Sequence, residues 1–423
     1  MKEFNCDLHF HGPQSSGVSK NMLLPVIAKQ SELKGLHVVS SADLLNAKWF
    51  EHVKKNLTEE ENNVFSVRDS DTKVILGTEI NCNKRVHHLI YFPSIESALE
   101  LKEKLKGKAI FDSWGCGRPT IHAGAEEIAE QVKDIGGIIG PAHAFTPYFS
   151  VYAHFNSLKE LYGEQEKNIY FMELGLSADT NLADLISENH KYNFLTNSDS
   201  HSPWPFRIGR EFNRIKMLKP NFDSLKKALK EKEEKLITLN VGLNPREGKY
   251  HLTACTKCFA KYSLEQSQKL NFKCMKCAGE IKKGVKDRIM ELKDSDEGIH
   301  PKFRPPYMHS VPLAEIIQSH FKVKNVNSVK VQSNWQDLID KFKTEITILV
   351  DAPIEEIIEE NSEIGKTIDS FRKGFIVYDS GGGGNYGTPY ICHSIKECEL
   401  KRKEIKEKNL IQRTIGQKTL GEY

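Results

Sequence analysis

Two histidines near the start of the sequence, His9 and His11, have the spacing of a metal-binding pair. Residues 4–8 are predicted to form a β-strand, and side chains at i and i+2 at the end of a strand project to the same side. Both imidazoles can therefore reach one metal ion. Such a pair also occurs as two polar residues leaving a strand, so its interpretation depends on the residues that follow.

Further His, Asp and Glu residues lie at or just past the ends of other predicted strands. These candidate ligands are Asp43, Glu79, His143, Asp199 and His201, after strands at 36–39, 74–77, 138–143 and 194–201. A β/α barrel builds its site from several strands, at the face formed by their carboxyl ends. Chance explains one or two such residues but not a series from five strands, so the sequence predicts a multi-metal site.

Alternating short strands and helices over the first 200 residues predict a β/α barrel or an open doubly wound sheet, and the ligand positions favour the barrel. Residues 86–92 form another predicted strand, which carries His87 and His88. Because neighbouring strand residues face opposite sides, one of them can be a ligand while the other is packed or supports the site. Mixed imidazole and carboxylate ligands suit zinc, manganese or iron better than magnesium.

The stretches that contain these residues resemble the PHP family of metal-dependent phosphoesterases. They are Asp7–His11, Ser41–Asp43, Gly77–Glu79, His87–His88, Gly140–His143 and Ser198–His201. The resemblance implies a distorted, seven-stranded β/α barrel with two or three divalent ions. Two such ions can ionise a shared water and neutralise charge on a phosphoryl group, which is the chemistry of phosphoester hydrolysis.

The same resemblance implies a role for each candidate ligand. The first ion would be held by His9, His11, Glu79 and Asp199, the second by Glu79 as a bridge with His143 and either His87 or His88, and a third near Asp43 and His201. Asp199, His201 and Glu79 are the expected catalytic residues. The family's Thr-Asp-His motif is here Ala42-Asp43-Leu44, so the third position departs from the family pattern.

Four cysteines form two C-x-x-C pairs, Cys255 with Cys258 and Cys274 with Cys277. Two such knuckles each supply two thiolates to one tetrahedral zinc ion. The sequence therefore predicts a zinc ribbon with one structural zinc, and a redox dithiol is the weaker alternative. Lysines and aromatic residues around the knuckles favour a polynucleotide as the ligand, although many zinc ribbons only stabilise the fold.

Two loops near the predicted site carry aromatic and arginine side chains that could stack a base and bind a backbone phosphate. They contain Trp114 and Arg118, and Trp204, Arg207 and Arg210. The alternative for Trp204 is that a loop fixed by prolines packs it into the rim of the barrel.

The C-terminal region, residues 293–423, is predicted to be mainly helical, with a strand at 346–351. A glycine run at 381–384 is either a hinge or a place where backbone approaches a phosphate chain. The last residues, with Gln417, Leu420 and Tyr423, resemble a shortened sliding-clamp interaction box, a pattern that also arises by chance.

Composition bounds the remaining possibilities. The 423 residues carry a net charge of only +3, so the overall balance does not indicate nucleic acid. We expect a cytoplasmic protein without membrane contact, because there is no apolar signal or spanning segment. The expected domains are a barrel at 1–240, a zinc ribbon at 245–292 and a mainly helical nucleic-acid-binding region at 293–423.

The succession of a PHP barrel, a four-cysteine ribbon and a helical C-terminal region resembles the endonuclease Q family over essentially the full chain. The resemblance implies a monomeric, nucleoid-associated DNA repair enzyme that cuts DNA 5′ of uracil, hypoxanthine, xanthine or an abasic site. It also implies that the damaged base is flipped into a pocket. Two alternatives remain, a small-molecule phosphatase of the PHP family and a non-catalytic nucleic-acid-binding scaffold.

Overall fold

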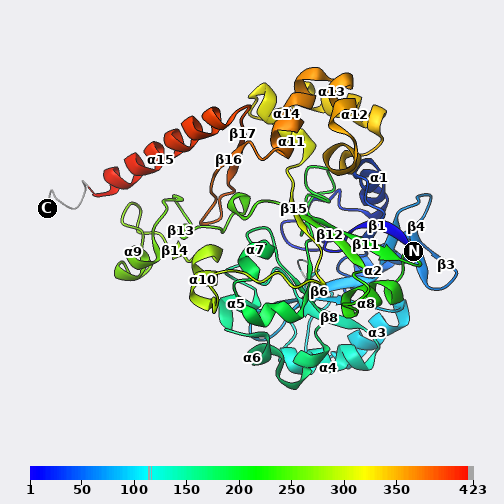
Figure 1. Cartoon of the computed structure of the whole chain (residues 1–423). Coiled ribbons are helices and arrows are strands. Elements are labelled where there is room, and N and C mark those ends of the chain that lie inside the picture. The colour runs from blue at the N-terminus through cyan, green and yellow to red at the C-terminus, as the bar shows by residue number, and fades with distance from the viewer. Residues whose placement is uncertain (113–114, 116, 418–423) are drawn as a thin grey trace. The chain divides into compact units, whose positions relative to one another are not determined.

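The largest sheet has eight strands in the order β15-β12-β11-β1-β2-β5-β4-β3 (Figure 1). The strands are β1 (Lys2–Asp7), β2 (Val38–Ser40), β3 (Leu57–Glu60), β4 (Val64–Val67), β5 (Lys73–Ile75), β11 (Phe212–Met217), β12 (Ile237–Gly242) and β15 (Tyr307–His309). Strand β1 is central, because it pairs in parallel with β2 and antiparallel with β11. The computed structural model describes residues 1–112, 115 and 117–417.

Two smaller sheets complete the strand framework of the N-terminal part. One joins β6 (Gly77–Asn81), β7 (His87–Tyr91) and β8 (Ile138–Pro141) in antiparallel fashion, and the other pairs β9 (Phe171–Glu173) with β10 (Asn193–Leu195) in parallel. The predicted α/β class is confirmed. The described strands of this part form three hydrogen-bonded sheets, and the distorted seven-stranded barrel stays a prediction.

The step from the first sheet to the second occurs within one residue, since β5 ends at Ile75 and β6 begins at Gly77. A Cβ atom at Gly77 would lie 2.9 Å from Ser40 Oγ and 3.0 Å from the Tyr91 ring. Glycine is therefore required for this close approach. The change of direction separates the pairing of β5 with β2 and β4 from the pairing of β6 with β7.

One apolar core draws residues from all three sheets. Its members include Leu8, Val38, Leu89, Phe171 and Leu195, all of them buried. The three sheets therefore pack around one common core. The surrounding helices are α1 (Leu24–Lys34), α2 (Ala47–Asn56), α3 (Ile95–Lys104), α4 (Ala125–Asp134), α5 (Val151–His154), α6 (Leu158–Tyr162), α7 (Thr180–Ala183) and α8 (Phe222–Lys230).

Helix α8 illustrates how the sequence determines where a helix begins and which of its sides is buried. Asn221 caps it by accepting a hydrogen bond from the Ser224 N–H, as a short polar residue does at a helix N-terminus. Its buried residues Phe222, Leu225 and Leu229 recur at helical spacing and join the apolar core.

The chain divides into two compact units. The first comprises Met1–Gly175, Asp179–Gly242 and Leu292–Ser310, and the second comprises Leu176–Ala178, Leu243–Glu291 and the chain from Val311 onward. Residues 293–310, which we expected in the C-terminal region, belong to the first unit, where β15 adds to the sheet beside β12. Within the described residues, no helix combines the length and apolar composition needed to cross a membrane.

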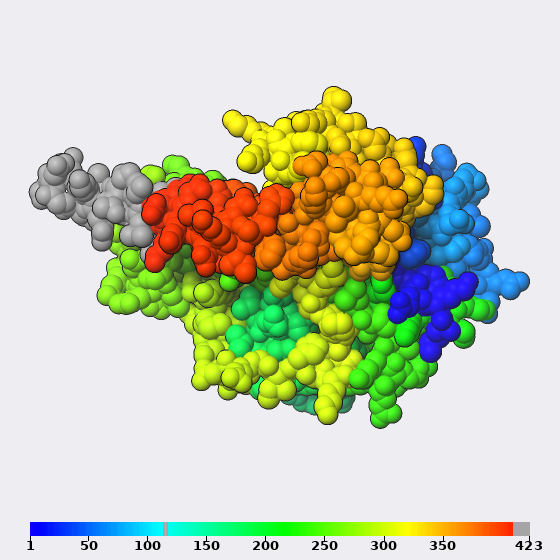
Figure 2. All heavy atoms as spheres, turned by 45° about the horizontal axis from the view of Figure 1, so that its top comes forward, coloured from blue at the N-terminus to red at the C-terminus, as the bar shows by residue number. Residues whose placement is uncertain are grey.

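The second unit contains the cysteine ribbon and a mainly helical region. Its elements are β13 (Ala254–Cys255), α9 (Leu264–Lys269), β14 (Ile281–Lys282), α10 (Val285–Leu292), α11 (Leu313–Phe321), α12 (Val329–Phe342), α13 (Ile354–Glu360), α14 (Ser362–Arg372), β16 (Ile376–Asp379), β17 (Thr388–Ile391) and α15 (Ile395–Gln417). Helix α15 extends from the β16–β17 hairpin as a rod (Figures 1 and 2).

One expectation for this unit was wrong. The expected strand at 346–351 is a turn of π-helix, Thr347–Asp351, with Ile348 and Leu349 buried. A short apolar run fits a buried helix as well as a strand, so its pattern alone could not decide. The glycine run at 381–384 is packed, because a Cβ atom at Gly383 would lie 2.3 Å from the Cys255 carbonyl oxygen. It is a close backbone contact with the ribbon, which argues against a hinge.

Candidate metal centre

Two groups of three potential metal ligands lie next to each other in the first unit. His9 and His11 follow β1 and join Asp199, which follows β10, whereas Glu79 on β6 joins His87 on β7 and His143 after β8. In each group the ligand atoms lie within 4.8 Å of one another.

Glu79 connects the two groups. Its Oε1 atom is 2.9 Å from His87 Nδ1 and 3.1 Å from His143 Nε2, both of its own group. The same carboxylate lies 3.6 Å from His9 Nε2 and 3.4 Å from His11 Nε2 of the other group. A carboxylate between two sets of imidazoles is the arrangement of a bridging ligand in a two-metal site.

The outward-facing nitrogens of His9 and His11 are held by carboxylates. His9 Nδ1 lies 3.0 Å from both oxygens of Glu173, and His11 Nδ1 lies 3.1 Å from Asp43 Oδ1. A protonated Nδ1 that donates to a carboxylate leaves Nε2 as the metal ligand. His9 Nε2 is buried without a hydrogen-bond partner and is directed into the centre. The donor set therefore fits divalent ions.

The electrostatics of the centre favour cations. Although burial opposes ionisation, His87 and His143 hold the pKa of Glu79 well below its usual range. The pKa of Asp199 is likewise well below its usual range, because His9 and His11 outweigh the effect of burial. Burial would lower the pKa of His9, yet Glu173 and Asp199 raise it to about 10. Such an imidazolium proton is displaced when a metal binds.

The neighbouring histidines of β7 have different surroundings. His87 joins the ligand group and stacks on the Phe149 ring at 4.7 Å between centroids. His88 faces away, with Nδ1 2.7 Å from the Tyr162 hydroxyl, and burial lowers its pKa to about 3. The structure thus places His87 and not His88 among the candidate ligands.

The loop that carries Asp199 is held by buried polar groups that sequence reasoning missed. Asp7 accepts hydrogen bonds from the Ser198 N–H at 3.0 Å and the Gly209 N–H at 2.8 Å. Asp199 itself has φ +47°, a left-handed conformation that is uncommon for non-glycine residues and that Asp tolerates better than most. The sequence signal for Asp7 was its place in the stretch Asp7–His11, two residues before His9.

Several predicted site residues lie outside the two ligand groups. His201 donates from Nδ1 to the Asp199 carbonyl at 3.0 Å, and burial together with His11 lowers its pKa to about 4. Arg210, expected to bind nucleic acid, is buried, and its guanidinium donates to the Ser198 carbonyl oxygen at 3.0 Å. Its place in the fold supports the Asp199 loop and leaves no surface for DNA.

The remaining candidates for contact with nucleic acid, and those for binding a clamp, lie at different places in the chain. The Arg118 guanidinium lies 3.5 Å from Glu79 Oε2, at the centre itself. Trp204 is 40% exposed. The Arg207 guanidinium lies over the Phe206 ring. Trp114, Leu420 and Tyr423 lie outside the described residues, and Gln417 is the last residue of α15.

The four cysteines predicted to bind zinc come together in the second unit. The Sγ atoms of Cys258 and Cys274 are 3.5 Å apart, as are those of Cys255 and Cys277. The Tyr262 hydroxyl lies 3.1 Å from Cys274 Sγ. Burial raises the pKa of that thiol, but this hydrogen bond and neighbouring backbone N–H groups bring it down to about 6. Four converging thiols of this kind fit a structural zinc ion.

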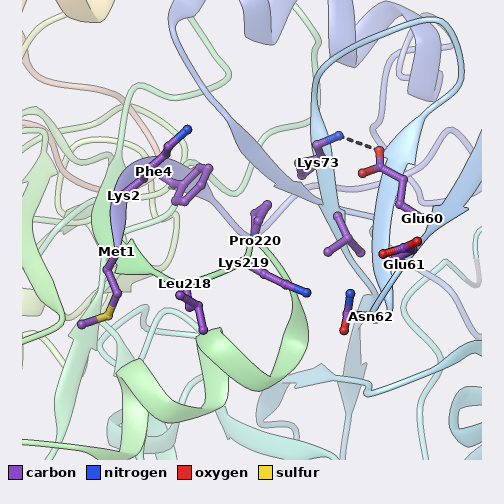
Figure 3. A pocket seen from close by; sticks show the side chains of 11 residues that line it. Met1, Lys2, Phe4, Glu60, Glu61, Asn62, Lys73, Leu218, Lys219 and Pro220 are labelled. Atoms are coloured by element: carbon purple, nitrogen blue, oxygen red, sulfur yellow. Dashed lines mark hydrogen bonds and ion pairs between the residues drawn. The ribbon is translucent and has the colours of Figure 1, made fainter.

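A cavity of about 660 Å³ lies elsewhere in the first unit, beside β1 and the β3–β4 hairpin (Figure 3). Its charged lining residues are partly paired, since Lys73 Nζ lies 2.6 Å from Glu60 Oε1. It contains none of the candidate ligands, so its size does not make it the site of metal chemistry.

The fold and these groups define a mixed α/β protein with a candidate metal centre of histidines and carboxylates and a separate cluster of four cysteines. Comparisons with known proteins agree. A crystal structure of the lesion-specific endonuclease Q of Pyrococcus furiosus superposes with a TM-score of 0.86 and 43% identity, over 94% of this chain and 97% of that one. A structure of endonuclease Q in complex with a 27-mer duplex substrate, with an abasic lesion at the active site, gives 0.86 and 42% identity over 92% and 97%. The chain belongs to the endonuclease Q family.

Two further proteins, both described as uncharacterized, are also similar in sequence to this chain. A Methanocaldococcus jannaschii protein is 45% identical over 256 residues, which is 59% of this chain but only 32% of that protein. A Bacillus subtilis protein is 29% identical over 415 residues, 92% of this chain and 99% of that one. Residues 312–375 match the family described as the MJ0043 C-terminal domain.

Proposed function

We propose that this chain is a metal-dependent DNA repair endonuclease that hydrolyses a phosphodiester bond beside a damaged nucleotide in duplex DNA. The observation that carries the proposal is the pair of ligand groups bridged by Glu79, in a chain that matches a lesion-specific endonuclease over 94% of its length. The finer proposal is a cut on the 5′ side of uracil, hypoxanthine, xanthine or an abasic site.

In this proposal His9, His11 and Asp199 would hold one divalent ion, and His87 and His143 would hold a second. The Glu79 carboxylate, which lies near the imidazoles of both groups, could serve either ion. When bound, the ions supply Lewis acidity and make a water molecule nucleophilic at neutral pH.

The chain's own residues position and assist this chemistry. Glu173 and Asp43 fix the rings of His9 and His11 so that each presents Nε2 to the centre. Arg118 places a guanidinium beside the carboxylates, where a phosphate oxygen would lie. The His201 side chain is 34% exposed and lies 3.9 Å from Asp199 Oδ1, so it stands at the rim where an imidazole can exchange a proton with solvent.

We propose that the second unit contributes to binding the DNA. Its cysteine knuckles expose Phe259 and Met275, which are 43% and 38% accessible. Lys257 and Lys276 are their neighbours in the sequence. Apolar side chains beside lysines suit an ordered contact with sugar and phosphate. Binding of a sliding clamp by Gln417, Leu420 and Tyr423 stays a prediction.

The test uses end-labelled duplexes that carry one deoxyuridine, deoxyinosine, deoxyxanthosine or abasic site, and an undamaged duplex. The protein, its Asp199→Ala variant and the surface control Asp223→Ala are incubated with divalent metal, and products are resolved on a denaturing gel. We expect one cut 5′ of the lesion with the unaltered protein and with Asp223→Ala, and none with Asp199→Ala.

Three results would contradict the proposal. Release of phosphate from a soluble monoester without cleavage of any duplex would indicate a small-molecule phosphatase. Tight binding of lesion DNA that stays intact with every metal would indicate a non-catalytic scaffold. Cleavage that survives Asp199→Ala would place the active site elsewhere.

A further inference from the structure

Phe149 contacts both a candidate metal ligand and an exposed arginine. Its ring stacks on the His87 imidazole, with 4.7 Å between the ring centroids and 17° between the ring planes. The central guanidinium carbon of Arg85 lies over the same ring, 5.1 Å from its centroid. The backbone adds a third link, because the His87 N–H donates to the Phe149 carbonyl oxygen at 2.9 Å. The three residues therefore form one cluster at the edge of the candidate metal centre.

The positions of these residues in the chain explain why they meet. Arg85 lies in the turn between β6 and β7, and His87 is the first residue of β7. Phe149 follows β8, in the segment that begins beside His143. Both segments adjoin a candidate ligand of the same group, so the cluster lies at the end of this sheet at which the ligands converge.

Arg85 has an unusual backbone conformation and an exposed side chain. Its φ is +61°, in the left-handed region that a bulky residue rarely adopts. Among the residues that the structure describes, no carboxylate forms an ion pair with it. An arginine that is stacked on an aromatic ring loses less conformational freedom when it binds, and its planar fork of donors matches phosphate oxygens. The alternative is an arginine that only completes the turn, since such contacts with aromatic rings are common.

The two stacking distances place Arg85 within reach of the DNA backbone at the centre. Its guanidinium is no farther from the His87 ring than these two distances taken together. One strand of DNA rises about 3.4 Å per nucleotide, so phosphates one or two nucleotides from a phosphate bound at the centre fall within this range.

We propose that Arg85 binds a phosphate of the DNA strand one or two nucleotides from the scissile phosphate, and that Phe149 is a positioning residue that holds both Arg85 and the His87 ring. This inference rests on the proposed nuclease function. A phosphate contact fixes the register of the strand and carries no information about the base, so it serves every lesion alike. Its loss should weaken substrate binding and leave the chemical step unchanged.

Arg85→Met removes the charge and keeps the apolar stem, whereas Arg85→Lys keeps a charge without the planar fork. The control is Arg68→Met, which alters an exposed arginine after β4, near the start of β5. KM and kcat are measured on a duplex with one abasic site over a series of KCl concentrations. In Arg85→Met we expect KM to rise about tenfold and kcat to stay within about twofold. The slope of log(kcat/KM) against log[KCl] should become less steep by about 1.

The other two variants give the comparison. Arg85→Lys should keep the slope of the unaltered protein and recover part of the KM, because the charge remains but the bidentate contact is lost. Arg68→Met should change neither quantity. Unchanged KM and slope in Arg85→Met, or equal changes in Arg68→Met, would overturn the phosphate contact.

Phe149→Leu tests the positioning role, alone and combined with Arg85→Met. Alone, it should raise KM because Arg85 loses its support, and lower kcat because the His87 ring loses its stacking partner. In the Arg85→Met background it should raise KM little further, since the effects of residues that act together are not additive. Phe149→Tyr keeps the ring and should restore both parameters. An equal rise of KM in the two backgrounds would contradict the positioning role.

The same variants separate this inference from the proposed function. If the unaltered protein cuts no duplex, the nuclease function fails. The abasic-site duplex then stays intact, and the Kd of each variant and its dependence on KCl, measured by fluorescence anisotropy, still decide whether Arg85 binds phosphate. If the unaltered protein neither cuts nor binds the duplex, both the function and the inference are refuted.

Discussion

Replacement of Glu173 by glutamine tests whether a carboxylate behind a ligand sets the metal affinity of the centre. The Glu173 carboxylate receives His9 Nδ1 at 3.0 Å, the His143 N–H at 2.7 Å and the Asn197 amide at 2.8 Å. Glutamine has the same shape but replaces one acceptor oxygen by an NH₂ group. Whichever way the amide is turned, that group faces a donor.

The magnitude of the effect follows from these contacts. One buried donor left without a partner costs about 1–3 kcal/mol of folding free energy. Losing the charged partner of a metal-binding histidine typically lowers metal affinity by about 10–100-fold. This corresponds to about 1.4–2.7 kcal/mol of binding free energy. We therefore expect Glu173→Gln to fold with a lower Tm and to bind one of its two ions more weakly.

A matched control separates these two effects. Glu188 also binds backbone within the first unit, where it accepts from the Leu158 N–H at 3.0 Å. Glu188→Gln should lower the Tm by a similar amount and leave manganese affinity unchanged. The assays are thermal unfolding and a competition titration with a chromophoric chelator. If Glu173→Gln binds both ions within about twofold of the unaltered protein, far below the effect expected of such a partner, the orientation argument is wrong.

Three further predictions concern other parts of the chain. Since the pKa of His88 is about 3 when folded and near 6.5 when unfolded, the unfolded state takes up the proton first, so stability is lost as the pH falls from about 6.5 towards 3. Chemical unfolding between pH 7 and 4 should show a smaller loss in His88→Gln, which keeps both manganese ions. Cys258→Ser should lose the single ribbon zinc in elemental analysis, whereas Cys392→Ser should retain it. Trp204→Ala should weaken binding of lesion DNA by about 1–3 kcal/mol if the exposed indole stacks on a base, as measured by fluorescence anisotropy, and Leu218→Ala should leave it unchanged.

The sequence was sufficient to find residues whose roles depend on strand geometry. The i, i+2 spacing of His9 and His11, and the positions of Glu79, His143 and Asp199 at strand ends, predicted residues that do converge. The two C-x-x-C pairs predicted a cluster for the same reason, because their spacing fixes which side chains can meet. Local geometry of this kind carries over directly from sequence to structure.

The sequence could not show which atom a polar side chain faces. Asp43 and Glu173 are both acidic residues near strand ends, yet each faces the far nitrogen of a histidine. Arg210 follows an exposed aromatic loop but turns inward to the Ser198 carbonyl. The choice between His87 and His88 depended on which face of β7 meets Glu79. The pairing of the strands decides which face this is, and the sequence pattern does not show it.

The two carboxylate–histidine pairs explain why so many charges can be buried at one place. His9 with Glu173 and His11 with Asp43 place a donor and an acceptor at hydrogen-bond distance behind each ligand, so no outward-facing nitrogen of this pair is left unsatisfied. Two buried atoms that lack a hydrogen-bond partner, His9 Nε2 and Glu79 Oε2, lie on the inward side. A buried polar atom without a partner is costly, and a cation removes that cost. The centre of the fold therefore has buried polar atoms that divalent ions would satisfy. Binding these ions should raise the stability of the first unit as well as permit catalysis.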